Sequence, residues 1–335
     1  MSKSEKWWKR RWFRAAVGII ITVLALWLSF RKINWPDFFE VLSRIQWEWA
    51  AAAVVNVVLS VYIMGWRLKV LLRPKGSFSM GKLFRLNMLS QYWSIVLPAR
   101  GGDVVKAYLL SREKKIEGGF AAGAVVLERM FDFFVFCVLV LAVPLFVGVE
   151  QSWFPGTKTA LISFIVLLAF VGFIAFVLWK PGLFLRAVEV FSRIFPQKFR
   201  KTLGDFFSSG TKSFQILKSP PIMGGLVLFT FFFVGLQVLS NYFVFLALGL
   251  KLSYWAALVV FLTLQVGSIP PSSPGKIGVF EVMVILALAV YGIEKAEALG
   301  YAVLLHLVVY VPKIVMGGWF VVSRARKAIK VVNGE

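Results

Sequence analysis

Cysteine and histidine are almost absent from this chain of 335 residues. Cys137 is the single cysteine, which excludes an intrachain disulfide, a zinc knuckle and a CxxC redox site. His306 is the single histidine, which excludes histidine-based metal cages and the HExxH arrangement of metalloproteases. We therefore expect neither a metal site nor a cofactor.

Charged residues are also scarce, at 16% of the chain, whereas residues of the set AVILMFWYC make up 59% and phenylalanine alone occurs 33 times. A soluble domain is roughly 45–50% apolar even when glycine is counted, and disordered chains are less apolar still. No single soluble core would bury this much apolar surface. The composition indicates an all-α polytopic membrane protein in which residues 1–335 form a single integral membrane domain.

Six apolar runs are long enough to cross a bilayer, whose hydrocarbon core needs roughly 20 residues of helix. The first follows a basic segment, but it is too long for a signal peptide and no A-x-A site follows it, so we expect a retained anchor. The six predicted spans are about Phe13–Phe30, Trp47–Trp66, Gly119–Val147, Thr159–Trp179, Ile222–Leu248 and Leu299–Val322.

Two further apolar stretches are each interrupted by a run of turn residues. The first, about 82–112, is broken by PARGGD at 98–103, and the second, about 255–292, is broken by PPSSPGK at 270–276. Each half is too short or too broken for a clean span, so we interpret both stretches as re-entrant helical hairpins. Three spans separate them, so they would enter from opposite sides, as in transporters built from inverted repeats. Whether the two halves of the chain form a true inverted repeat is left open.

The chain carries 38 Lys and Arg against 16 Asp and Glu, a formal net charge of +22. With a cytoplasmic N-terminus and re-entrant hairpins, roughly three quarters of the basic residues fall on the cytoplasmic side. The charge therefore predicts a multi-pass protein of the cytoplasmic (inner) membrane with both termini in the cytoplasm. A nucleic-acid partner is not expected, because the charge is spread among loops between spans.

Three shorter features are expected to pack at the membrane surface or between helices. Apolar residues recur at helical spacing over 35–49, which predicts a helix lying in the membrane interface. The segment of about 180–220 is basic and amphipathic, which predicts cytoplasmic helices near anionic lipid. Gly119 and Gly123 form a GxxxG pattern, which predicts close packing against another helix.

The interrupted stretches also resemble a known family. Residues 97–108 (LPARGGDVVKAY), the triplet at 127–129 (LER) with Asp132, and residues 271–281 (PSSPGKIGVFE) are similar to the lysylphosphatidylglycerol synthase transmembrane, or flippase-like, family. The resemblance covers nearly the whole chain and implies a membrane protein that moves lipids or lipid-linked head groups between leaflets. The soluble aminoacyl-transfer domain of the multiple peptide resistance factor has no counterpart here, so we expect a stand-alone member.

Charged residues at membrane depth are costly and usually functional. Arginine and lysine at the hairpin tips would hold a phosphate, with glycine amides close by, while the carboxylates would balance charge, bind a cationic head group or carry protons. No catalytic residue is assigned. The predicted substrate-binding residues are Arg100, Gly101, Gly102, Asp103, Lys106, Glu128, Arg129, Asp132, Ser272, Ser273, Gly275, Lys276 and Glu281.

Structural roles stay open for several of these residues. Glu128 and Asp132 share one helix face and would repel unless a cation lies between them, for which Arg129 is the candidate. Asp103 would otherwise cap the helix that follows the first tip.

Alternatives are also open around the second tip. Lys276 would begin a helix, where a cation is disfavoured, so we expect it to find a partner, either a lipid phosphate or Glu281. His306 and Lys313 lie near one helix face and would meet Glu281 in a proton relay, or His306 would bond a backbone carbonyl.

The leading prediction is a lipid translocase, a transporter rather than an enzyme, with a polar groove formed by the two hairpins. Its partners would be anionic or aminoacylated phospholipids, or a polyprenyl-phosphate-linked head group, and a homo-oligomer is left open. The alternatives are an integral-membrane transferase acting on a polyprenyl-phosphate or phospholipid substrate, and a membrane scaffold for a separate synthase. The sequence shows no nucleophile–base pair or nucleotide loop, which argues against the transferase.

Overall fold

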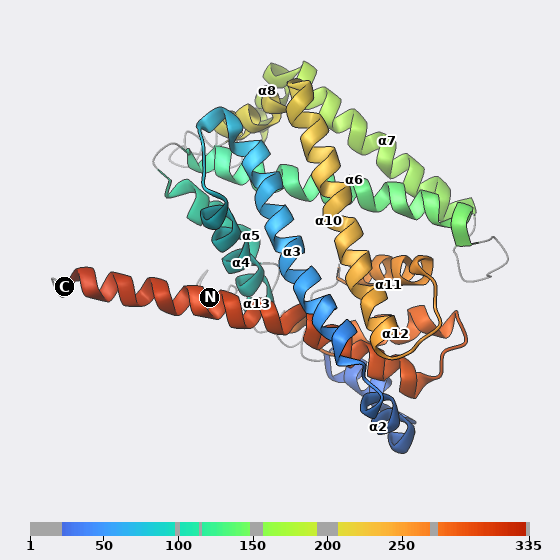
Figure 1. Cartoon of the computed structure of the whole chain (residues 1–335). Helices are drawn as coiled ribbons and strands as arrows, with labels where there is room; N and C mark the ends of the chain where they lie inside the picture. The colour runs from blue at the N-terminus through green and yellow to red at the C-terminus, as the bar shows by residue number, and fades with distance from the viewer. Residues whose placement is uncertain are drawn as a thin grey trace, which may run out of the picture. The chain divides into compact units, whose positions relative to one another are not determined.

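The computed structural model describes residues 22–97, 101–113, 116–147, 157–192, 207–268 and 274–332 (Figure 1). All regular structure within these ranges is helical, which confirms the predicted all-α class. Residues 22–30 and 207–215 are helical, and short 3-10 turns lie at η1 (Arg73–Lys75), η2 (Ile216–Lys218) and η3 (Pro274–Lys276). The other helices are α2 (Trp35–Ser43), α3 (Trp47–Leu72), α4 (Met80–Val96), α5 (Gly101–Ser111), α6 (Gly118–Val147), α7 (Thr157–Trp179), α8 (Pro181–Ser192), α10 (Pro220–Ala247), α11 (Tyr254–Gly267), α12 (Val279–Ala289) and α13 (Lys295–Val332).

Three helices in the described ranges are long and apolar enough to cross a membrane, at Trp47–Lys75, Pro220–Ala247 and Lys295–Ser323. They coincide with three of the predicted spans. Two more predicted spans coincide with α6 and α7, of 30 and 23 residues. At 1.5 Å per residue these helices are about 45 and 34 Å long, which exceeds the roughly 30 Å of a bilayer core. Of the first predicted span, residues 13–21 lie outside the described residues.

Proline and glycine set the ends of α10 in the way their backbone chemistry requires. The helix begins at Pro220, where the missing amide donor costs nothing because a first-turn amide has no partner within the helix. After it, Gly249 has φ +68°, and the amide of Leu250 donates to the carbonyl of Phe245 at 2.9 Å. This left-handed cap satisfies a carbonyl that the helix leaves unpaired.

Two compact units, interleaved in sequence, make up the chain. The first unit comprises Met1–Val58, Tyr92–Gly101 and Gln237–Met316, and the second comprises Leu59–Gln91, Gly102–Leu236 and Gly317–Glu335. The single integral membrane domain over residues 1–335 stays a prediction.

In the second unit, residues 80–91 of α4 and residues 102–111 of α5 lie side by side (Figure 1). Near the tip, the Ser90 hydroxyl donates to the carbonyl of Gly102 at 3.0 Å, and at the open ends Lys82 Nζ lies 2.6 Å from Glu113 Oε2. With 17 and 11 residues, the helices are about 26 and 17 Å long, too short to cross a bilayer core separately. The stretch predicted at about 82–112 is therefore a helical hairpin, and its re-entry into the membrane stays a prediction.

In the first unit, α11 and α12 pack against each other as the second hairpin. Gly267 allows this approach, because a Cβ atom there would lie 2.3 Å from Cγ of Met283. Beside the tip, Lys276 Nζ donates to Oγ of Ser268 at 2.6 Å. Gly275 has φ +71°, a left-handed conformation that favours glycine, so this residue lets the chain turn toward α12.

The predicted surface segments are helical where the structure describes them. In α2, Phe38 is buried against Leu299 of the first unit, while Trp35 and Phe39 are exposed. Within about 180–220, α8 and residues 207–215 are helical, and residues 193–206 lie outside the described residues. Contact of either segment with the membrane surface stays a prediction.

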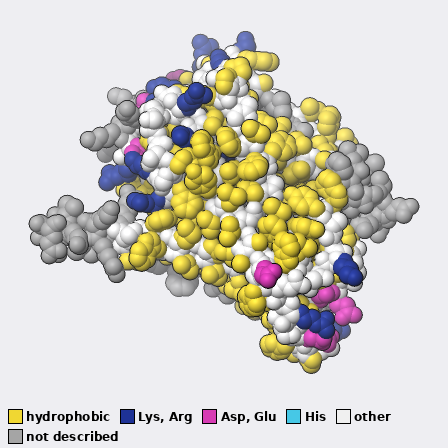
Figure 2. All heavy atoms as spheres, in the orientation of Figure 1, with side chains coloured by type: hydrophobic (Ala, Val, Ile, Leu, Met, Phe, Trp, Pro, Cys, Tyr) yellow, Lys and Arg dark blue, Asp and Glu magenta, His cyan; other side chains and the backbone are white. Residues whose placement is uncertain are grey.

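Exposed apolar side chains cover a broad area of the face drawn in Figure 2, and most charged side chains lie outside this area. Trp47 and Trp179, at the ends of α3 and α7, are 71% and 79% exposed. Tryptophan is enriched where membrane helices meet the lipid–water interface. The surface is thus suited to contact with lipid.

Small residues allow α6 to approach the helix at 207–215 in the second unit. A Cβ atom on Gly123 would lie 2.8 Å from the carbonyl oxygen of Gly210, and Ser213 Oγ donates to the carbonyl of Phe120 at 3.0 Å. Just before α6, a hydrogen bond from Ser209 and the nearby Lys212 ammonium lower the pKa of Glu117. The packing role predicted for Gly123 is confirmed.

The Gly123→Ala variant should therefore unfold at a lower temperature than the wild type. The added methyl group would lie 2.7 Å from Oγ of Ser213 and 2.8 Å from the carbonyl oxygen of Gly210, and overpacking of this kind costs about 1–3 kcal/mol. Thermal unfolding in detergent, followed by tryptophan fluorescence, measures the shift. The matched control is Gly172→Ala on α7, where a Cβ atom meets nothing within 4 Å; equal melting temperatures for the two variants would contradict the prediction.

Candidate functional site

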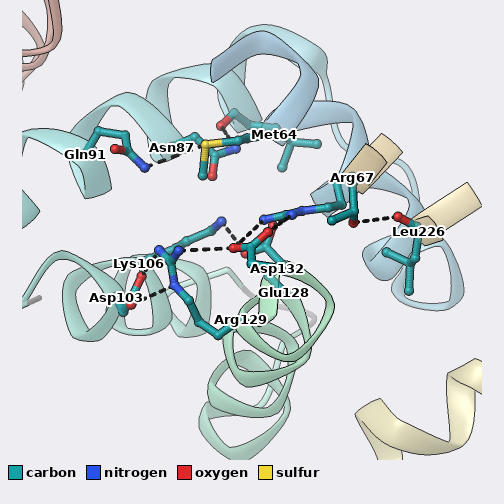
Figure 3. Close-up of polar contacts among 12 residues, drawn as sticks. Met64, Arg67, Asn87, Gln91, Asp103, Lys106, Glu128, Arg129, Asp132 and Leu226 are labelled. Carbon is teal, nitrogen blue, oxygen red and sulfur yellow. Dashed lines mark hydrogen bonds and ion pairs between the residues drawn. The ribbon is translucent and has the colours of Figure 1, made fainter. Parts of the chain in front are cut away.

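Six charged side chains form one ion network inside the second unit (Figure 3). Three are basic and three are acidic, so the network is formally neutral. It joins α3, α5 and α6, and Figure 3 shows the side chains converging from these helices. Its members are Arg67, Asp103, Lys106, Glu128, Arg129 and Asp132.

Arg67 of α3 bridges two carboxylates that lie one helical turn apart on α6. Its Nη1 bonds Oδ1 of Asp132, and its Nε lies 3.6 Å from Oε1 of Glu128. Its guanidinium also lies over the ring of Phe233, 5.3 Å from the ring centre. Arg67 is therefore the cation that relieves repulsion between the two carboxylates.

Lys106 of α5 completes the neutralisation of Glu128. Its ammonium bonds Oε2 of Glu128, and both side chains are buried. A buried ion pair of this kind costs desolvation energy when it forms, but removing one partner is far worse because the other charge is left uncompensated. The pair consequently holds α5 against α6.

Arg129 of α6 binds the start of α5 through a two-pronged contact. Its Nε and Nη2 donate to the two carboxylate oxygens of Asp103, at 2.9 and 2.5 Å, and its Nη1 donates to Asp132 at 3.2 Å. Asp103 lies in the first turn of α5, where the helix dipole also favours a negative charge. The parallel fork gives this contact both strength and direction.

Burial divides the network into a closed end and an open end. The side chains of Arg67 and Glu128 are 1% and 3% exposed, whereas those of Arg129 and Asp103 are 37% and 20% exposed. The Arg129–Asp103 contact is thus the most exposed part of the network.

The structure shows the expected ion pair of Arg129 with Asp132 and adds a member of the network, Arg67, that the sequence analysis did not include. Arg129 contacts Asp132 but follows Glu128 directly, and adjacent helical residues point in different directions. Arg67 directly follows the predicted end of a span at Trp66, but in the structure it lies inside α3 and is buried. The sequence does contain a pattern that places Arg67 inside the helix, because apolar residues continue past Trp66 at Leu68, Leu71 and Leu72.

The other predicted residues of the first tip are not members of the ion network. The carbonyl of Gly102 accepts a hydrogen bond from Ser90, which links α4 to α5. Gly101 lies against Leu97 in the first unit, where a Cβ atom would come within 2.8 Å of the leucine Cβ. Arg100 lies outside the described residues, as do Ser272 and Ser273 of the second tip.

Glu281 and His306 meet in the first unit, separate from the ion network. Glu281 Oε2 accepts from the amide of Gly278 at 2.6 Å, and its Oε1 lies 2.7 Å from Nδ1 of His306. His306 therefore bonds a carboxylate, and the alternative of a backbone carbonyl is wrong. The ring of Tyr310 packs on the imidazole, with 4.3 Å between the ring centres.

Lys313 does not join this contact, so a relay through it stays a prediction. Its side chain is buried, and no hydrogen bond or ion pair to its ammonium is found among the described residues. Within the described ranges, no group of three or more His, Cys, Asp or Glu is arranged to hold a metal.

Replacing Lys106 with methionine should destabilise the protein more than replacing both Lys106 and Glu128 with apolar residues. The single variant leaves Glu128 short of one counter-charge, at a cost of about 3–5 kcal/mol, whereas an apolar pair of similar volume is close to neutral. Thermal unfolding of Lys106→Met, Glu128→Leu and the double variant gives the coupling. Additive losses in the double variant would show that the buried pair does not hold α5.

Comparison with known proteins agrees with the resemblance noted in the sequence. A family model described as the lysylphosphatidylglycerol synthase TM region matches residues 15–317. A UPF0104 membrane protein of Methanocaldococcus jannaschii is 22% identical over 316 residues, covering 91% of this chain and 93% of that protein. Another, from Pyrococcus horikoshii, is 21% identical over 333 residues, covering 95% and 98%.

A shorter match concerns a named enzyme. Glycosyltransferase AglD of Haloferax volcanii is 37% identical over 122 residues, which are 34% of this chain and 19% of that protein. The family relates to lipid or lipid-linked substrates in membranes. Because the family model spans most of its length, the chain belongs to the lysylphosphatidylglycerol synthase transmembrane family and is a multi-pass membrane protein.

Proposed function

We propose that this protein moves a phospholipid or a lipid-linked head group between membrane leaflets, with the ion network receiving the head group. The observation that carries the proposal is the open end of the network, where Arg129 and Asp103 are partly exposed while the rest is buried. A head group crossing a bilayer must exchange water for other polar partners, and this network offers charges of both signs.

The position of the network within α6 supports this role. Glu128 and Asp132 follow the first residue of α6 by ten and fourteen positions, or about 15 and 21 Å along the helix axis. Apolar residues lie on both sides of them in the sequence. Ionised groups at membrane depth are rare and mark pathways for ions or substrates.

The short hairpin supports the proposal because a re-entrant α4–α5 pair would bring its tip into the membrane. Asp103 lies in the first turn of α5, directly after the tip. The Arg129–Asp103 fork would thus lie at the inner end of the hairpin, where a head group would pass. The distribution of basic residues favours the cytoplasmic membrane, with both termini in the cytoplasm.

The contacts of the network suggest how a head group would be held. A lipid phosphate would compete with Asp103 for the guanidinium of Arg129, which is suited to bidentate phosphate contacts. A cationic amino group, as on an aminoacylated lipid, would compete for Asp103 or Asp132. Exposed ion pairs are worth little and open readily, whereas the buried Lys106–Glu128 pair would stay closed and keep α5 in place.

A transferase acting on a lipid-linked substrate is the second candidate, because glycosyltransferase AglD is similar to one part of the chain. If this protein is a transferase, it should convert a lipid-linked sugar chemically without moving it between leaflets. Purified protein incubated with a radiolabelled polyprenyl-phosphate sugar would distinguish this candidate from the translocase.

Proteoliposomes should flip head-group-labelled phosphatidylglycerol faster than protein-free vesicles, measured as the fraction that dithionite bleaches. The Arg129→Gln variant should flip at least about tenfold more slowly, equivalent to about 1.4 kcal/mol of barrier, because it removes the fork at the open end. The control is Lys82→Met, which removes an exposed ion pair at the far end of the same hairpin.

Two outcomes would overturn the translocase. One is wild-type protein that flips no lipid faster than empty vesicles across phosphatidylglycerol, its lysyl ester and polyprenyl phosphates. The other is equal flipping by Arg129→Gln and the wild type, which would remove the network from the pathway. Melting temperatures of both variants confirm that the proteins compared are folded.

A further inference from the structure

Glu281 of α12 and His306 of α13 form a carboxylate–imidazole pair inside the first unit. Oε1 of Glu281 lies 2.7 Å from Nδ1 of His306, and the two side chains are 8% and 15% exposed. His306 follows the first residue of α13 by eleven positions, or about 17 Å along a helix that is long and apolar enough to cross a membrane. Ionisable residues at such depth are costly to bury and mark paths for protons or substrates.

The hydrogen bonds of the pair determine which nitrogen of His306 exchanges a proton. An ionised carboxylate only accepts hydrogen bonds, so Nδ1 of His306 donates to Oε1 of Glu281 while the amide of Gly278 donates to Oε2 at 2.6 Å. In the neutral imidazole, Nε2 is then the nitrogen that can accept a proton. No hydrogen bond to Nε2 is found among the described residues, and Nε2 is not among the side-chain atoms that are buried without a partner. It is therefore partly accessible.

Two aromatic rings pack on the imidazole. The ring centres of Phe280 and Tyr310 lie 4.6 and 4.3 Å from the centre of the imidazole ring. Aromatic rings attract a cation through the negative charge of their faces, and the carboxylate of Glu281 attracts it more strongly at short range. A proton gained at Nε2 would thus be held by one carboxylate and two rings that are already in place.

The elements packed around the pair bring few other charges to it. α12 carries no other titratable side chain, and α11, which packs against it, carries only Tyr254 at its first residue. The helix at 22–30, which passes close to Gly278, carries none. In α2, which packs on the start of α13, Asp37 and Glu40 accept bonds from Asn34 and Arg44.

The remaining titratable groups nearby are not bonded to the pair. On α13, Lys313 follows His306 by seven positions, or about 10 Å along the helix, and Tyr301 donates to Asn241 of α10. Within the described ranges, Glu281 and His306 bond each other and the amide of Gly278 only. The groups without a bond to either are Tyr242, Lys276, Tyr291, Lys295, Glu297 and Lys313.

We propose that His306 and Glu281 form a proton-binding site through which a proton gradient drives the movement of lipid. Protonation adds one hydrogen to Nε2 while Nδ1 stays bonded to Glu281, and deprotonation returns that hydrogen to water. The site deepens the proposed function by naming its coupling ion, and it rests on that function for the lipid. The alternative is a structural bond that only holds α12 against α13.

Nuclear magnetic resonance tests the site directly, because His306 is the single histidine of the chain. The full-length protein, labelled with ¹³C-histidine and purified through a tag without histidine, would be titrated in detergent micelles. We expect the imidazole signal to titrate between about pH 5 and 8. Glu281→Gln should lower the midpoint by at least about one pH unit, a tenfold loss of proton affinity, because an amide does not attract the added charge. Glu294→Gln, which alters an exposed carboxylate of the same unit, is the matched control and should leave the midpoint unchanged.

Flipping of head-group-labelled phosphatidylglycerol across a pH gradient tests the coupling. In vesicles loaded at about pH 6 and placed in buffer at about pH 7.5, a range in which histidine changes charge, a proton ionophore should slow flipping by the wild type at least about threefold. His306→Asn offers Glu281 an amide donor near the position of Nδ1 but cannot gain a proton. The ionophore should therefore leave the flipping rate of His306→Asn unchanged.

Several outcomes overturn the proposal. One is an imidazole that does not titrate, and another is a midpoint that Glu281→Gln leaves unchanged. A third is an ionophore that does not slow the wild type, or that slows His306→Asn as much. If Glu281→Gln does not fold, the titration of the wild type and the response of His306→Asn still decide.

The proton site and the lipid function fail separately, because titration in micelles requires no movement between leaflets. Flipping by the wild type that ignores the gradient would remove the coupling and keep the translocase. A titration that depends on Glu281, in a protein that flips no lipid, would keep the proton site and remove the translocase.

Discussion

Everything in the second unit depends on the balance of charge between α6 and its neighbours. An apolar helix that carries Glu128 and Asp132 one turn apart cannot be buried unless cations reach both carboxylates. Arg67 supplies one cation from α3 and Lys106 supplies another from α5, so the two acidic residues select which helices lie against α6. The network is therefore a packing constraint as well as a polar site in an apolar medium.

The need to balance buried charge also explains why the Arg129–Asp103 ion pair is suited to open whereas the Lys106–Glu128 ion pair is not. Lys106 and Glu128 are shielded from solvent, so breaking their pair would leave a charge without compensation. Arg129 and Asp103 are partly exposed, and water or a head group can replace either partner at small cost. In the function proposed above, a fixed pair beside an exchangeable pair would let the protein bind and release a charged group while α5 stays attached.

The charged residues of the first unit are arranged differently from those of the ion network. The acidic residue at the second hairpin, Glu281, is already satisfied by His306 and a backbone amide. Lys313 is buried on α13, and no described residue forms an ion pair with it.

Much of the architecture could be predicted because it follows from local composition. Apolar runs of sufficient length marked α3, α6, α7, α10 and α13, and the Pro- and Gly-rich interruptions marked both hairpins. The resemblance to the family also depended on contiguous motifs, and the family model confirmed it. The end of α3 was misplaced, because a single arginine was taken as the border of an apolar run that continues beyond it.

The sequence by itself determined that this is an all-α membrane protein with two broken helices and a few charges at depth, since hydrophobicity and turn chemistry act over short distances along the chain. Only the tertiary structure decided which charges pair. Arg67 reaches Asp132 across 65 positions, and His306 reaches Glu281 across 25. Such pairings depend on helix packing and burial, and these arise from contacts between segments that no local pattern records.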